Sequence, residues 1–190
     1  MTRITKPPEE RRQEIIDTAM KVFYEKGYEK TSISDIAREM HVAQGLCYRY
    51  FSSKEELFDT ALDQYAMLQV QRLCANMRQD MSLSELAANA PSFLETENDD
   101  SCAEKFYHDS GNAKFHWQLS LKVCEKLQPI VADFLRAAIA RGEIRLADPD
   151  TAASFFVYGQ LGILLDHTLP AQERVMRVRR FLSDILKNFC

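Results

Sequence analysis

Glycine and proline are scarce in this chain of 190 residues, which contains six of each. Segments that alternate polar and apolar residues, as a half-buried strand does, are absent as well. Most of the chain instead repeats its apolar residues at intervals of three and four, which is typical of helices that pack through one face. We therefore predict an all-α fold.

Long hydrophobic runs are also missing. No apolar run approaches the roughly 20 residues that a membrane-spanning helix requires, and the segment Met1–Arg12 is polar rather than signal-like. The composition, 46% hydrophobic and 27% charged, is that of a soluble globular protein. We expect a cytoplasmic protein that does not bind membranes, with one full domain or a small domain sharing a helix with a larger one.

Cysteine occurs five times, at widely spaced positions and without a Cys-x-x-Cys pair. This pattern indicates neither a disulfide framework nor a zinc ribbon, so buried or idle thiols are the simpler interpretation. We expect neither a metal ion nor a cofactor. One alternative stays open, although its spacing does not favour it, namely a metal site built from Cys102, His108, His116 and Cys124.

The net charge of -4 is unevenly distributed along the chain. Residues 1–54 carry 10 Lys and Arg against 8 Asp and Glu, a net of +2, whereas the remainder carries 14 against 20. A mildly basic N-terminal part on an acidic body fits a head that approaches a polyanion. The imbalance is too small to decide the function alone.

Capping signals divide the N-terminal part into four expected helices. The first covers 8–26 and is stopped by Gly27. Ser32 with Asp35 predicts a capping box for a short second helix, and Ser53 with Glu56 caps the fourth. These signals predict helices over 8–26, 33–40, 43–51 and 54–77.

The middle and the C-terminal part continue the helical pattern. A short helix near 83–90 precedes the acidic segment 91–112, which is poorly periodic and the likeliest to be flexible. We predict a helix over 113–141 that breaks or kinks at Pro129 and ends at Gly142. Asp148 and Pro149 open the next helix as N-cap and first helical residue.

The two C-terminal helices have more apolar surface than a small monomer needs. The helix after Asp148 is apolar nearly all the way round and contains Gly159 and Gly162. The last helix, over 171–188, should place three arginines opposite an apolar stripe; the arginines are Arg174, Arg177 and Arg180, and the stripe is Val175, Val178, Leu182, Ile185 and Leu186. We predict a homodimer interface formed by these two helices.

The short helices 33–40 and 43–51, joined by a tight turn, have the dimensions of a helix-turn-helix, whose second helix enters the DNA major groove. Cys47 and Phe51 should face inward. On the outward face, Gln44 can offer a paired donor and acceptor to adenine, and Gly45 lets the backbone approach the duplex. The outward set is completed by the phosphate-reaching pair Tyr48 and Arg49.

Lys54 supplies a second clue. A lysine in the first turn of a helix opposes the helix dipole. The position becomes favourable if the ammonium and the free backbone N–H groups hold a DNA phosphate together. The simpler alternative is a solvated surface charge.

Residues 11–58 resemble the N-terminal DNA-binding region of TetR-type transcriptional regulators. The resemblance covers about 50 residues and rests on several fixed spacings, which are an Ile-Ala pair (Ile36, Ala37), a Gly-x-x-Tyr (Gly45, Tyr48), Phe51, and Ser-Lys-Glu (Ser53, Lys54, Glu55). Two departures are Ala43, where the family often has a serine N-cap, and Cys47, where a bulkier aliphatic residue is common.

The resemblance implies a three-helix DNA-binding domain over 1–53 and a helical effector-binding and dimerisation domain over 54–190. It implies a non-enzymatic regulator, in most cases a repressor, that binds a palindromic double-stranded DNA operator as a homodimer and is released by a small-molecule effector. The DNA-contacting residues carried over by position are Ser32, Ser34, Gln44, Gly45, Tyr48, Arg49, Tyr50 and Lys54.

The effector site is far less determined. Aromatic and amphipathic residues of the second domain suggest an apolar or aromatic effector, with His116 and Trp117 as orienting polar groups. The alternative for each of them is an ordinary core residue. The candidates are Phe93, Phe106, Tyr107, His116, Trp117, Phe155 and Tyr158.

Two other classes of protein fit the sequence less well than a regulator does. An all-α enzyme or small-molecule-binding protein would use the helix-turn-helix only as packing, but no nucleophile–base spacing and no Gly-rich phosphate loop is present. A structural DNA-coating protein is disfavoured by the low positive charge, because sequence-independent binding depends on neutralising phosphates.

Overall fold

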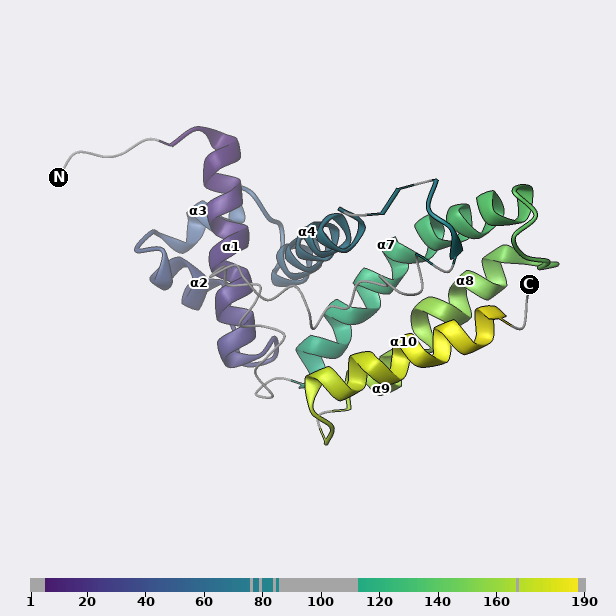
Figure 1. Cartoon of the computed structure of the whole chain (residues 1–190). Coiled ribbons are helices and arrows are strands. Elements are labelled where there is room, and N and C mark those ends of the chain that lie inside the picture. The colour runs from purple at the N-terminus through teal and green to yellow at the C-terminus, as the bar shows by residue number, and fades with distance from the viewer. Residues whose placement is uncertain are drawn as a thin grey trace.

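The computed structural model describes residues 6–75, 77–78, 80–83, 85, 113–166 and 168–187. The predicted all-α fold is confirmed, since every regular element of these residues is a helix (Figure 1). The predicted helix near 83–90 and the segment 91–112 lie almost entirely outside the described residues. The helices are α1 (Pro8–Lys26), α2 (Ile33–Glu39), α3 (Gln44–Tyr48), α4 (Lys54–Cys74), α7 (Ala113–Ala140), α8 (Pro149–Tyr158), α9 (Leu161–Leu164) and α10 (Ala171–Lys187).

Helices α1, α2 and α3 form a small head at one end of the molecule (Figure 1). Gly27 ends α1 with a positive φ of 81°, as predicted. The capping box of α2 is also confirmed: Asp35 N donates to Ser32 Oγ over 3.2 Å, and Ser32 N donates to Asp35 Oδ2 over 2.9 Å. Local signals therefore define both ends of the α1–α2 connection.

Helix α3 is shorter than the predicted 43–51. After Tyr48 the chain tightens into three-residue hydrogen bonds, from Arg49 N to Leu46 O and from Tyr50 N to Cys47 O. Such tightening is common at the last turn of a helix because it satisfies orphan carbonyls. Ala43 is the N-cap and makes no side-chain cap, as the sequence predicts.

Helix α4 joins the head to the body. It begins at the Ser53 cap, as predicted, but ends at Cys74 rather than near Met77. Its apolar side packs against α1 and α7 in one core, in which Phe23, Phe58 and Phe115 are buried. The predicted domain boundary at residue 54 thus coincides with the first residue of a helix that both parts share.

Helix α7 runs unbroken through Pro129, so of the predicted break or kink the break is wrong. Pro129 is exposed, whereas residues before and after it, such as Cys124 and Leu135, are buried against neighbouring helices. Packing on both sides of the proline therefore keeps the helix continuous despite the lost backbone hydrogen bond. The predicted stop at Gly142 is confirmed by its φ of 75°.

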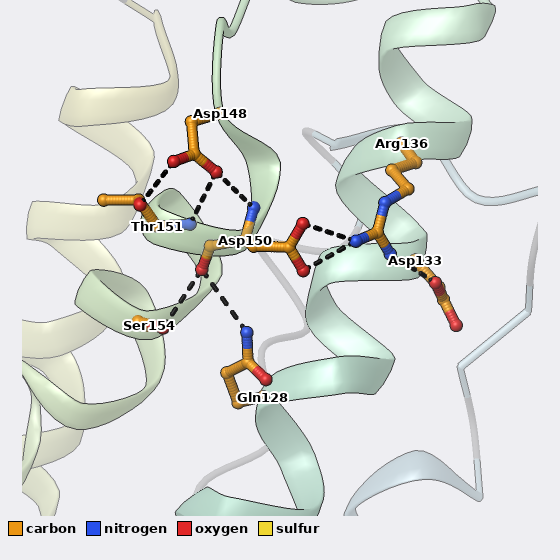
Figure 2. A network of polar contacts seen from close by, with 7 residues as sticks. All are labelled: Gln128, Asp133, Arg136, Asp148, Asp150, Thr151 and Ser154. Atoms are coloured by element: carbon orange, nitrogen blue, oxygen red, sulfur yellow. Dashed lines mark hydrogen bonds and ion pairs between the residues drawn. The ribbon is translucent and has the colours of Figure 1, made fainter.

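The helix predicted after Asp148 is divided into α8 and α9. Asp148 caps α8 as predicted, accepting from Asp150 N and Thr151 N. A Cβ added at Gly159 would lie 2.5 Å from Phe155 O, so the turn between the two helices requires glycine at this position. Figure 2 shows polar contacts between α8 and α7, in which Arg136 Nη2 donates to both carboxylate oxygens of Asp150 over 2.6 and 2.5 Å.

The prediction that Arg174, Arg177 and Arg180 all lie on an exposed side of α10 is wrong for Arg174. It is buried, 7% exposed, and Nη1 donates to Leu164 O of α9. The hydrogen bond to a carbonyl at the end of α9 compensates part of the cost of burying the guanidinium. Arg177 and Arg180 are exposed, as predicted. Among the described residues, no helix is long and apolar enough to cross a membrane.

Candidate nucleic-acid interface

The outward face of α3 carries three polar side chains that are exposed to solvent. Gln44, Tyr48 and Arg49 are exposed, Tyr48 by 49%. Within the described part of the chain, their side chains make no hydrogen bond or ion pair. The predicted orientation of these three residues is confirmed, and their donors and acceptors are available to an external ligand.

The inner face of α3 is seated in the head core. Cys47 and Phe51 are fully buried, and Tyr50 lies half-buried at the boundary, as the sequence predicts. Burial raises the pKa of the Cys47 thiol, so it behaves as a small apolar residue. The Arg12 guanidinium of α1 lies 5.0 Å from the centre of the Phe51 ring and covers the end of the helix.

Gly45 is not explained by the fold. A Cβ added there would meet nothing within 4 Å, and the residue does not have a positive φ. Neither packing nor backbone conformation therefore requires glycine, although glycine weakens a helix relative to alanine. The backbone at Gly45 is therefore open on the outward face of α3.

The two predicted serines of α2 differ. The Ser32 hydroxyl donates to Asp35 Oδ2 over 2.5 Å, so its single proton is already used within the capping box. Hydrogen bonds from the Ser32 hydroxyl and backbone lower the pKa of the Asp35 carboxyl to about 2. Ser34 is half-buried and has no partner among the described residues, so it is the more available of the two.

Lys54 is neither a solvated charge nor an open phosphate site in this structure. Its ammonium donates to Tyr28 O over 3.0 Å and to Thr31 O over 3.1 Å. It also lies 4.1 Å from the centre of the Tyr28 ring, a favourable cation–π distance. The residue that the sequence assigns to a phosphate is thus bound to the turn between α1 and α2.

Arg38 is a candidate contact that sequence reasoning missed. Its side chain is 77% exposed and lies 3.3 Å from Asp35, a weak surface pair. It follows Ser34 by four residues on α2, so both share one face of the helix. This spacing is visible in the sequence and could have identified it.

The four predicted effector residues that lie in the described part of the chain are not brought together in one site. His116 is buried beside Tyr24 of α1, with ring centres 6.1 Å apart. The next residue, Trp117, is 46% exposed, and Phe155 and Tyr158 lie on the surface of α8. The remaining three candidates, Phe93, Phe106 and Tyr107, lie outside the described residues.

Two hollows in the described part of the chain have other linings. One of about 690 Å³ lies along the outer side of α4, between Arg12 and Lys122, and one of about 360 Å³ lies where the end of α1 meets Lys114. No group of three or more possible metal ligands occurs among the described residues. Cys102 and His108, from the alternative metal site, are outside them.

The helix-turn-helix segment of this chain is similar to those of known regulatory proteins. Residues 15–61 match the family described as bacterial regulatory proteins, tetR family. The transcriptional regulator HbdR of Aromatoleum is 51% identical over 49 residues, 26% of this chain and 21% of that protein. The regulator YuxN of Bacillus subtilis is 45% identical over 56 residues, 30% of this chain and 19% of that protein. The chain thus spans about a fifth of the length of these curated relatives.

The fold similarity extends further than the sequence similarity. A TetR-family transcriptional regulator from Pectobacterium atrosepticum superimposes with a TM-score of 0.66 at 19% identity, covering 97% of each chain. At this identity the likeness concerns the fold alone. Residues 15–61 therefore match the tetR family of bacterial regulatory proteins, and the all-α fold of the described chain is shared with a solved TetR-family regulator.

Proposed function

We propose that this protein is a transcriptional regulator, most simply a repressor, which binds a palindromic operator as a homodimer in the cytoplasm and responds to a small-molecule effector. It is not an enzyme in this account. The observation that carries the proposal is the outward face of α3. There Gln44, Tyr48 and Arg49 are exposed and have no partner in the described part of the chain, beside a glycine that the described fold does not require.

The proposed division of labour on DNA follows from side-chain chemistry. Gln44 pairs with an adenine edge in the major groove, and Gly45 brings the backbone close to the duplex. Tyr48 and Arg49 bind phosphates and set the register of the head, aided by Ser34 and Tyr50. Ser32 acts chiefly through the capping box, because its proton is already used.

The proposed dimer uses α8 and α10. Large apolar side chains of these helices remain exposed, among them Phe155 at 75% and Phe181 at 59%. Large apolar side chains left exposed on two helices support an interaction surface there. A second copy of the chain would bury them in a helix bundle and hold two heads at the spacing of successive major grooves.

For the effector, a buried acceptor supports a more specific proposal than apolar character alone. Gln69 of α4 is 3% exposed, and its Oε1 has no hydrogen-bond partner among the residues that the structure describes. Such an atom costs about 1–3 kcal/mol, which an effector with a hydrogen-bond donor would offset. Gln69→Leu should raise the melting temperature of the free protein and abolish any shift that a donor-bearing compound produces in the parent protein.

Selection of DNA from a random library tests the central proposal. Enrichment of a duplex with two related half-sites about one helical turn apart supports a dimeric groove reader. A protein that enriches no sequence, or that binds all duplexes equally at physiological salt, is not an operator-binding regulator. The selected duplex then serves as the probe for the variants below.

A further inference from the structure

The contacts of Lys54 point to a role for a residue pair that the helix-turn-helix pattern does not assign. We infer that Lys54 and Tyr28 form a pin that holds the start of α2 in its DNA-reading position, and that Lys54 supports operator binding by positioning rather than by binding phosphate. The inference rests on the proposed operator binding and assigns a positioning role within that site.

The ammonium of Lys54 has two acceptors on one short segment. Tyr28 O and Thr31 O lie 3.0 and 3.1 Å from Nζ, and Thr31 N also donates to Tyr28 O over 3.2 Å. These carbonyls belong to the turn that follows α1 and directly precedes Ser32, the N-cap of α2. Lys54, the first residue of α4, is therefore hydrogen-bonded to a turn that lies more than 20 residues earlier in the chain.

The Tyr28 ring completes the pin from the other side. It lies below the ammonium and packs against Phe58, with ring centres 4.6 Å apart, and against Phe23 at 5.8 Å. Phe58 and Phe23 are buried in the core that the head shares with α4. The ring is thus held by the core, and the ammonium is held by the ring and the turn.

The contacts of Lys54 also affect the far end of the turn, where the chain enters α2. Thr31, whose hydroxyl donates to Gly27 O over 2.8 Å, is buried and leads directly into α2. The half-buried Ser34 and the exposed Arg38 lie on one face of that helix. If the turn loosens, these residues lose their fixed position relative to α3, and specific binding weakens although no direct DNA contact has been removed.

The test measures affinity for the selected duplex and its salt dependence. Lys54→Met and Tyr28→Leu should each weaken specific binding about tenfold, and the double variant should lose little more, because either change opens the same pin. Non-specific affinity should change far less. Two controls should bind nearly normally: Tyr28→Phe keeps the ring, and Lys30→Met removes one exposed positive charge from the same segment.

The alternative outcomes are distinct. If Lys54→Met alone weakens binding and lowers the slope of log affinity against log salt by about 0.9, Lys54 binds a phosphate directly and the pin is wrong. Additive losses, or normal binding by both variants, also overturn it. Lys54→Gln replaces Lys54→Met if the latter does not fold.

The pin can also be tested without DNA. Urea unfolding of the single and double variants should show coupling between Lys54 and Tyr28, and its absence would contradict the pin whatever the DNA result. Failure of the parent protein to select any duplex would instead refute the proposed function.

Discussion

At the scale of single residues, two glycines of this chain serve opposite purposes. Gly159 is required by the fold, because a Cβ there would lie 2.5 Å from Phe155 O. Gly45 is not required, since its Cβ would meet nothing. The sequence places Gly45 on the outward face of its helix and Gly159 in a nearly all-apolar helix, but the packing requirement at Gly159 is visible only from the surrounding atoms.

Replacement by alanine should have opposite effects on stability at the two glycines. Gly45→Ala should leave the free energy of unfolding unchanged or raise it by about 0.5–1 kcal/mol, while weakening operator binding tenfold or more because a methyl group enters the DNA contact. Gly159→Ala should destabilise the protein by about 1–3 kcal/mol. Urea unfolding and fluorescence anisotropy measure both effects. Normal operator binding by Gly45→Ala would contradict the groove assignment.

At the scale of helices, the ends of α2 and α3 differ in how they are capped. Ser32 and Asp35 cap α2 reciprocally, whereas Ala43 begins α3 with cap-like dihedrals, φ −71° and ψ 139°, but no side-chain acceptor. Ala43→Ser should therefore stabilise the head by about 1 kcal/mol. Thermal unfolding checks this, with Ala75→Ser at the exposed C-terminal end of α4 as control. An unchanged melting temperature for Ala43→Ser would show that α3 gains nothing from a cap.

The capping box of α2 also predicts a dependence on acid. The pKa of folded Asp35, about 2, lies below its ordinary value of 3.8. The ionised carboxylate therefore stabilises the head above pH of about 4, and this contribution is lost as pH falls through about 2. Asp35→Asn should lower stability at neutral pH and flatten its decline between these values. Glu25→Gln, which changes an exposed acid of α1, should keep the parent profile in acid unfolding followed by circular dichroism.

Sequence reasoning predicted the helices whose ends depend on neighbouring residues. The bounds of α1, the capping box of α2 and the start of α8 follow from groups three or four residues apart. The partners of Lys54 and Arg174 lie 26 and 10 residues away, so their roles depend on how helices pack. A pattern of polar spacing cannot show that a charged side chain is already bound within the fold.

At the scale of the whole molecule, binding of a palindromic operator requires a dimer that holds two heads. Phe155→Asp combined with Phe181→Asp places charges on the exposed apolar surface of α8 and α10, so the variant should sediment as a monomer at micromolar concentration. Leu68→Asp, which charges an exposed leucine of α4, should stay dimeric. A parent protein that is itself monomeric, or a double variant that remains dimeric, would contradict the proposed interface.

The most direct measurement of the central claim is the affinity of α3 variants for the selected duplex at several salt concentrations. Arg49→Ala should weaken binding and reduce the salt slope by about 0.9, and Tyr48→Ala should weaken binding while both proteins keep the parent melting temperature. Arg145→Ala, which removes an exposed arginine from the body, should bind as the parent does. If Tyr48→Ala and Arg49→Ala bind the duplex as tightly as the Arg145 control, α3 does not read DNA.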